Sequence, residues 1–245
     1  MTGEAVVALL VALSFSAAHL FGGRLTFLDV TPRSIWLSIA GGVSVAYVFV
    51  HLLPEIAEHQ EAFARSAEQG DGFAQAIELH VYLFALIGLG VFYGLERLAC
   101  RSQAGRGGDD TDWIFWIHLG SFAVYNFLLG YMLLHRGEAE PGDLFFYAIA
   151  ILLHFIVNDH ALREHHGTAY HRNGRWLLAA APLMGWLLGV MTDVSELLIA
   201  ASFGFLAGGI VLNVLKEELP ESRESRFWAF ALGGGAYAAL LVRFV

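Results

Sequence analysis

Residues 5–23 read AVVALLVALSFSAAHLFGG and contain no Asp, Glu, Lys or Arg. A helix needs roughly 20 mostly apolar residues, with about 17 as the lower limit, to cross the hydrocarbon core of a bilayer. Only 15% of the 245 residues are charged and 57% are apolar, so similar runs recur along the chain. The uncharged runs are residues 5–23, 34–54, 79–95, 113–135, 144–158, 176–192, 197–215 and 227–242. We therefore predict an all-α, polytopic integral membrane protein with eight transmembrane helices.

Eight spans of this length use most of the chain and leave only short connections between them. The sequence thus predicts a single transmembrane domain over residues 1–245 and no separate soluble domain. The predicted spans are about 4–23, 34–55, 77–97, 113–135, 143–163, 176–193, 196–217 and 226–244. Glu4 is the only charged residue before the first run. A secretory signal peptide begins with a basic segment, so we expect the first run to be retained as a helix.

The 14 Lys and Arg residues indicate how the spans are oriented. An even number of spans puts Arg65, Arg136 and Arg243 on one side with both termini, and the other basic residues on the opposite side. Basic connections of this length stay in the cytoplasm, so we predict a protein of the cell's inner or plasma membrane with both termini outside the cytoplasm. The formal net charge of −9 then falls on the outer face, where acidic residues concentrate cations.

The second and seventh predicted spans end in related motifs. One ends His51-Leu52-Leu53-Pro54-Glu55 and the other Glu217-Glu218-Leu219-Pro220-Glu221, and Ala-Gly-Gly precedes each, at 40–42 and 207–209. In the predicted topology the second span runs outward and the seventh runs inward. Opposed copies of one unit build a midplane site in many transporters. We therefore predict an inverted repeat of helices 1–3 and 6–8.

Polar side chains within the spans are the candidate functional residues, because a polar group at membrane depth is costly and usually faces the bundle interior. Asn126 lies deep in the fourth span and His154 deep in the fifth. Asn158 follows His154 by four residues and therefore lies on the same helix face. Imidazole, amide and carboxylate groups together suit a divalent cation. A lone intramembrane Asn also serves as an interhelical hydrogen-bonding group, and this alternative stays open for Asn126. The candidate metal ligands are Asn126, His154, Asn158, Glu217, His51, Glu55 and Asp159.

The chain resembles the ZIP family of divalent metal transporters over essentially its whole length. The shared features are eight predicted helices, external termini and the paired Leu-Pro-Glu motifs. Asn126 and Gly130 match two positions of the family's His-Asn-x-x-Asp/Glu-Gly signature on helix four. His154 matches the first position of His-Glu/Asp-x-Pro-His/Glu on helix five, and Asn158 stands at the last position. The family's acidic ligand on helix seven falls at Glu217. The resemblance implies a metal site of Asn126, His154, Asn158 and Glu217, with His51 or Asp159 as additions.

The resemblance implies transport of a divalent cation toward the cytoplasm by alternating access, without enzyme activity or an organic cofactor. Zn is the first candidate substrate, and Fe, Mn, Ni and Cd are others. Leu129 and Phe155 stand where the family has carboxylates. This favours an alternative, a ZIP-like membrane protein that acts as a non-transporting binding or regulatory protein or carries another solute. A third hypothesis is an intramembrane zinc hydrolase, motivated by Asn158, Asp159 and His160.

The expected partners follow from the same features. They are the lipid bilayer, the metal ion and a second copy of the chain in a homodimer. The sequence has no basic stripe, so nucleic-acid binding is not expected.

Overall fold

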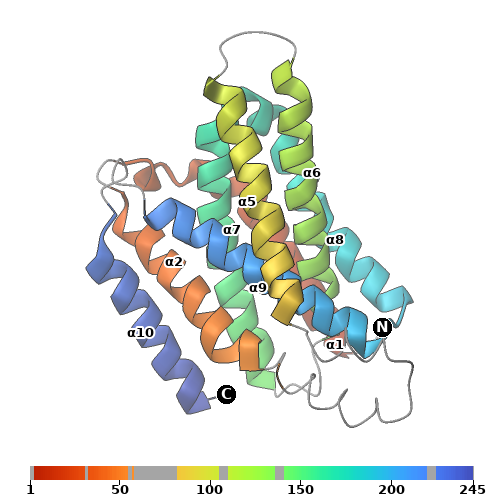
Figure 1. Cartoon of the computed structure of the whole chain (residues 1–245). Helices are drawn as coiled ribbons and strands as arrows, with labels where there is room; N and C mark the ends of the chain where they lie inside the picture. The colour runs from red at the N-terminus through yellow and green to blue at the C-terminus, as the bar shows by residue number, and fades with distance from the viewer. Residues whose placement is uncertain are drawn as a thin grey trace.

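The computed structural model describes residues 3–30, 33–54, 57, 82–104, 110–135, 141–219 and 225–244. These residues form helices and short turns, and no strand occurs among them, which confirms the predicted all-α class (Figure 1). The α-helices are α1 (Gly3–Phe21), α2 (Ile35–Tyr47), α5 (Tyr82–Ala104), α6 (Asp110–Tyr131), α7 (Pro141–Ala169), α8 (Arg175–Met191), α9 (Glu196–Glu218) and α10 (Phe227–Phe244). The 3-10 turns η1 (Gly22–Arg24) and η2 (Thr26–Leu28) follow α1, and the π-helical segments η3 (Val48–Leu52) and η5 (Tyr170–Gly174) follow α2 and α7.

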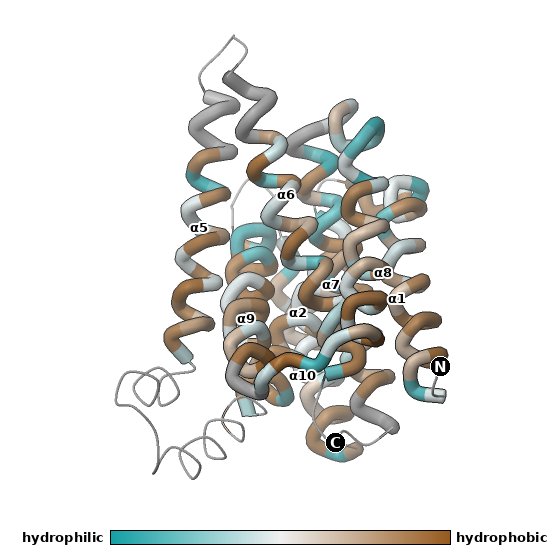
Figure 2. Tube along the Cα trace, turned by 90° about the vertical axis from the view of Figure 1, so that its right-hand side faces the viewer, coloured by the Kyte–Doolittle hydropathy of each residue, from teal (hydrophilic) through white to brown (hydrophobic). Residues whose placement is uncertain are grey.

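Several of these helices have the length and composition of membrane spans. The six candidates are Gly3–Arg24, Ile35–Leu52, Leu144–Glu164, Gly167–Met191, Leu198–Glu218 and Phe227–Phe244. In Figure 2 hydrophobic residues, coloured brown, recur along α1, α5 and α8. Large apolar side chains such as Trp36, Met184 and Trp228 are exposed on the outer helix faces, as expected of surfaces that contact lipid. The structure therefore supports an integral membrane protein. The helices α5 and α6 cover much of the other two predicted spans.

Close helix pairs form where a glycine meets the backbone of a neighbouring helix. Gly42 of α2 faces the carbonyl oxygen of Phe230 in α10, and Gly208 of α9 faces that of Ala85 in α5. Gly130 of α6 meets the α8 backbone in the same way. A Cβ at any of these three glycines would overlap the neighbouring backbone. Small residues allow helices to approach closely in membranes, and here they hold α2 on α10, α9 on α5 and α6 on α8.

The helices α2 and α9 run in opposite directions (Figure 1). Arg33 and Ser38, at the beginning of α2, contact Glu218 at the end of α9. The two chain termini lie toward the same end of the bundle in both views (Figures 1 and 2). Both features agree with an up-and-down helix bundle.

We expect Gly42→Ala to destabilise the folded protein by about 1–3 kcal/mol, because the added methyl group would overlap the α10 backbone. Gly235→Ala is the matched control on α10, since nothing lies within 4 Å of a Cβ built there. Alanine at an open helical position should be neutral or slightly stabilising. Thermal unfolding of both variants in one detergent measures the difference. Equal melting temperatures would contradict the close contact between α2 and α10.

Candidate functional site

Three polar side chains from three helices meet inside the bundle. Nδ1 of His19 in α1 lies 2.9 and 3.0 Å from the two carboxylate oxygens of Asp159 in α7. Nδ2 of Asn126 in α6 lies 2.9 Å from Nε2 of the same histidine. Each of the three residues is at most 2% exposed. We call His19, Asn126 and Asp159 the His19 cluster.

Hydrogen bonding assigns the proton on His19. An ionised carboxylate only accepts hydrogen bonds, so Nδ1 of His19 carries the proton that it donates to Asp159. The amide Nδ2 of Asn126 donates to Nε2 of His19, whose lone pair therefore points at Asn126. A carboxylate hydrogen-bonded to an imidazole orients the ring, and this arrangement supports metal-ligating histidines in many proteins. His19 is thus held with its unprotonated Nε2 directed at Asn126.

His154 lies beside the His19 cluster on α7. Its Nε2 is 3.2 Å from the hydroxyl of Tyr125, the residue that precedes Asn126 on α6. Nδ1 of His154 and Oδ1 of Asn126 are buried without a hydrogen-bond partner among the described residues. A buried polar atom left unpaired costs roughly 1–3 kcal/mol. One such atom on α6 and one on α7 are thus left unpaired among the described residues.

A second buried cluster joins the beginning of α2 to the end of α9. Nε of Arg33 donates to Oε1 of Glu218 at 2.9 Å, and Nη1 of Arg33 lies 3.4 Å from Oε2 of Glu217. The hydroxyl of Ser38 donates to Oε2 of Glu218 at 2.9 Å. All four residues are buried, and we call them the Arg33 cluster. One guanidinium therefore faces two carboxylates in a region that excludes water, so the cluster carries a formal charge of −1.

A cavity of about 320 Å³ opens close to the His19 cluster. Its lining residues are Asp29, Val30, His160, Arg163, Glu164 and His171. The turn η1 separates this cavity from Asp159: Gly22 packs over the Asp159 carboxylate, and Gly23 packs against Arg163 and His171. One short turn of small residues therefore lies between the buried carboxylate and a charged cavity.

The structure brings several of the predicted ligands together. Asn126 and Asp159 meet through His19, and His154 contacts Tyr125, the residue before Asn126. Asn158 is buried one helix turn from His154. Of the residues that the sequence singled out, Asn126 of α6 and Asp159 of α7 thus meet at His19 of α1.

The remaining predicted ligands lie elsewhere. Glu217 belongs to the Arg33 cluster, where its carboxylate faces a guanidinium. His51 is half-buried in η3, with its ring centroid 5.1 Å from that of Tyr47. Glu55 lies outside the described residues. Within the part of the chain that the structure describes, no three His, Cys, Asp or Glu side chains are grouped closely enough to hold a metal ion.

His19 and Arg33 are the central residues that the predicted ligand set omits. His19 is a histidine inside an uncharged run, the same signal that singles out His154, so the sequence could have identified it. Arg33 counts in the sequence only as a basic residue of a connection. Its pairing with Glu217 and Glu218 spans more than 180 residues, and no sequence pattern indicates it.

The comparisons with known proteins leave the site to be interpreted from its own chemistry. No protein-family model, no curated protein and no solved structure matches the chain. The fold and the two clusters define a class: a polytopic helical membrane protein with a histidine–carboxylate–amide cluster and an arginine–glutamate cluster buried among its helices.

Proposed function

We propose that this protein is a ZIP-like transporter that moves a divalent cation across the membrane toward the cytoplasm. The observation that carries the proposal is the His19 cluster, in which a buried carboxylate orients an imidazole whose second nitrogen faces an amide. Ionisable groups at membrane depth are costly and mark substrate pathways when they are retained. Packing alone does not need three polar groups on three helices, two of them ionisable.

The chemistry of the cluster suits a borderline cation. The donor groups are Nε2 of His19, Oδ1 of Asn126 once its amide turns, a ring nitrogen of His154 and the amide oxygen of Asn158. Zn²⁺ takes about four nitrogen, oxygen or sulfur ligands. It is the first candidate substrate, and Fe, Mn, Ni and Cd accept similar donors. In this assignment Asp159 orients His19 and balances charge.

Features of α2 and α9 support alternating access by an inverted repeat. Gly42 and Gly208 each stand twelve residues before the proline of their motif. Each packs tightly on another helix, α10 in one case and α5 in the other. The two helices also run antiparallel. Rocking of opposed repeats exposes a central site to each side in turn, and separation of Arg33 from Glu217 and Glu218 would open the end of the bundle near the charged cavity.

A second function is favoured by one specific contact. Arg33 already neutralises Glu217, the acid that the family resemblance assigns as a ligand. A ZIP-like protein with this pairing would bind metal without transport, act as a regulatory membrane protein, or carry another solute.

Uptake of Zn²⁺ into proteoliposomes tests the proposal. We expect the purified protein to load vesicles with Zn²⁺ and His154→Ala to lower the initial rate roughly 10- to 100-fold, since a ligand is lost from a site with few donors. His135→Ala is the matched control, because His135 lies at the end of α6 and contacts Tyr131 and Asp193. It should transport normally.

The outcomes separate the two functions. No uptake of Zn, Fe, Mn, Ni or Cd would refute transport of metal. Stoichiometric Zn²⁺ binding without uptake would support the second function. Equal uptake rates for the His154 and His135 variants would show that His154 is not part of the transport site.

A further inference from the structure

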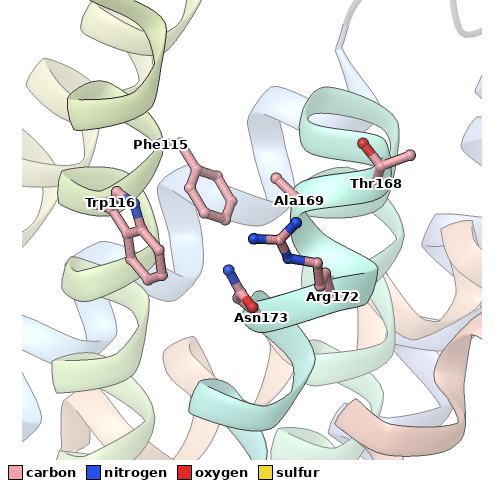
Figure 3. A pocket seen from close by; sticks show the side chains of 6 residues that line it. All are labelled: Phe115, Trp116, Thr168, Ala169, Arg172 and Asn173. Atoms are coloured by element: carbon pink, nitrogen blue, oxygen red, sulfur yellow. The ribbon is translucent and has the colours of Figure 1, made fainter.

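A second cavity, of about 340 Å³, lies between α6 and the segment that joins α7 to α8. Its lining residues are Phe115, Trp116, Thr168, Ala169, Arg172 and Asn173. Figure 3 shows the Arg172 guanidinium and the Asn173 amide directed toward the space that the two aromatic rings of α6 face. None of the lining residues is acidic. The cavity therefore combines one positive charge and amide donors with an aromatic wall.

The backbone holds these donors in place. The helix α7 breaks at Gly167, which has a φ of 44°, a conformation that favours glycine. The chain then continues as the π-helical segment η5, and such wide turns are frequent at functional sites. Gly174 at the end of η5 packs against Tyr170 and Leu119, which seats the segment on α6. Arg172 and Asn173 are thus presented by a braced turn.

The surroundings of the cavity are those of a membrane–water interface. Trp116 is 48% exposed and Trp176, one helix turn after Arg172, is 57% exposed. Trp side chains are enriched at the level of the lipid headgroups. The Arg175 guanidinium lies 5.3 Å from the Trp176 ring, over its face. The connection that carries Arg163, Arg172 and Arg175 is also predicted to be cytoplasmic, the side on which anionic lipids concentrate.

We propose that this cavity binds the phosphate of an anionic phospholipid. Arginine recognises phosphate through paired N–H donors, and Arg172 supplies them here with Asn173 alongside. Phe115 and Trp116 would contact the glycerol and upper acyl region, which a free phosphate ion lacks. The inference does not depend on transport of a metal, because its residues lie outside the His19 and Arg33 clusters.

Native mass spectrometry of the full chain, released from micelles with added lipid, tests the assignment. We expect phosphatidylglycerol to be retained in preference to phosphatidylcholine, and Arg172→Ala to lower its affinity about tenfold, as for loss of one charge-assisted hydrogen-bonding group. Arg243→Ala is the control, because Arg243 is an exposed arginine at the end of α10. It should retain lipid as the unmodified protein does.

Two kinds of result would overturn the proposal. One is equal retention of phosphatidylglycerol by the Arg172 and Arg243 variants, or equal retention of the two lipids. The other is binding of inorganic phosphate that depends on Arg172 without preference for phosphatidylglycerol, which would assign the cavity to a free anion. Melting temperatures of both variants, which replace exposed side chains, verify that the folded state is intact.

Discussion

Arg33→Met is expected to lower the free energy of unfolding by about 3–5 kcal/mol, the cost of removing one partner from a buried ion pair. Arg33 is 4% exposed, and it is the guanidinium that faces the carboxylates of Glu217 and Glu218. Methionine keeps much of the side-chain volume but removes the guanidinium that faces both buried acids. Reversible unfolding in mixed micelles measures the loss.

Two further variants distinguish this explanation from a general loss of packing. Adding Glu218→Gln to Arg33→Met should recover part of the lost stability, because it removes the charge of the acid that lies nearest to Arg33. Arg243→Met, at an exposed position, should unfold like the unmodified protein. If Arg33→Met proves as stable as Arg243→Met, the Arg33 cluster does not hold the ends of α2 and α9 together.

Asp159→Asn is expected to weaken Zn²⁺ binding roughly 10- to 100-fold, the usual effect of removing the partner that orients a metal-binding histidine. The amide keeps the shape of the carboxylate but loses its charge. The imidazole of His19 would then be less firmly oriented, and the positive charge of a bound cation would be less well balanced. Isothermal titration calorimetry of the purified protein with Zn²⁺ measures the change in affinity.

Asp29→Asn provides the comparison, because Asp29 is a partly exposed acid that lines the neighbouring cavity. It should change the affinity much less than Asp159→Asn. His19→Ala should weaken binding at least as far as Asp159→Asn, since it removes the oriented imidazole itself. A Zn²⁺ affinity that is unchanged in both the Asp159 and His19 variants would show that the cluster serves the fold and not a cation.

The composition of the chain was sufficient to predict the helical class. A bilayer offers no hydrogen-bond partners to an open backbone, so long uncharged runs such as residues 5–23 must be helical. Helical periodicity also placed Asn158 one turn from His154 on α7. Those predictions depend on residues close together in the sequence, where the geometry of one helix fixes the outcome.

The composition of each cluster depended on the tertiary structure. The pairing of His19 with Asp159 joins residues 140 positions apart, and that of Arg33 with Glu218 joins residues 185 positions apart. Periodicity defines the faces of one helix but leaves open which face meets which neighbour. The glycine contacts of α2, α6 and α9 determine which helix faces meet, because they set how closely and in which direction the helices pack. The sequence alone therefore determined a bundle of membrane helices with polar residues inside it. Only the packing of those helices brought the Asp159 carboxylate to His19 and the Arg33 guanidinium to Glu217.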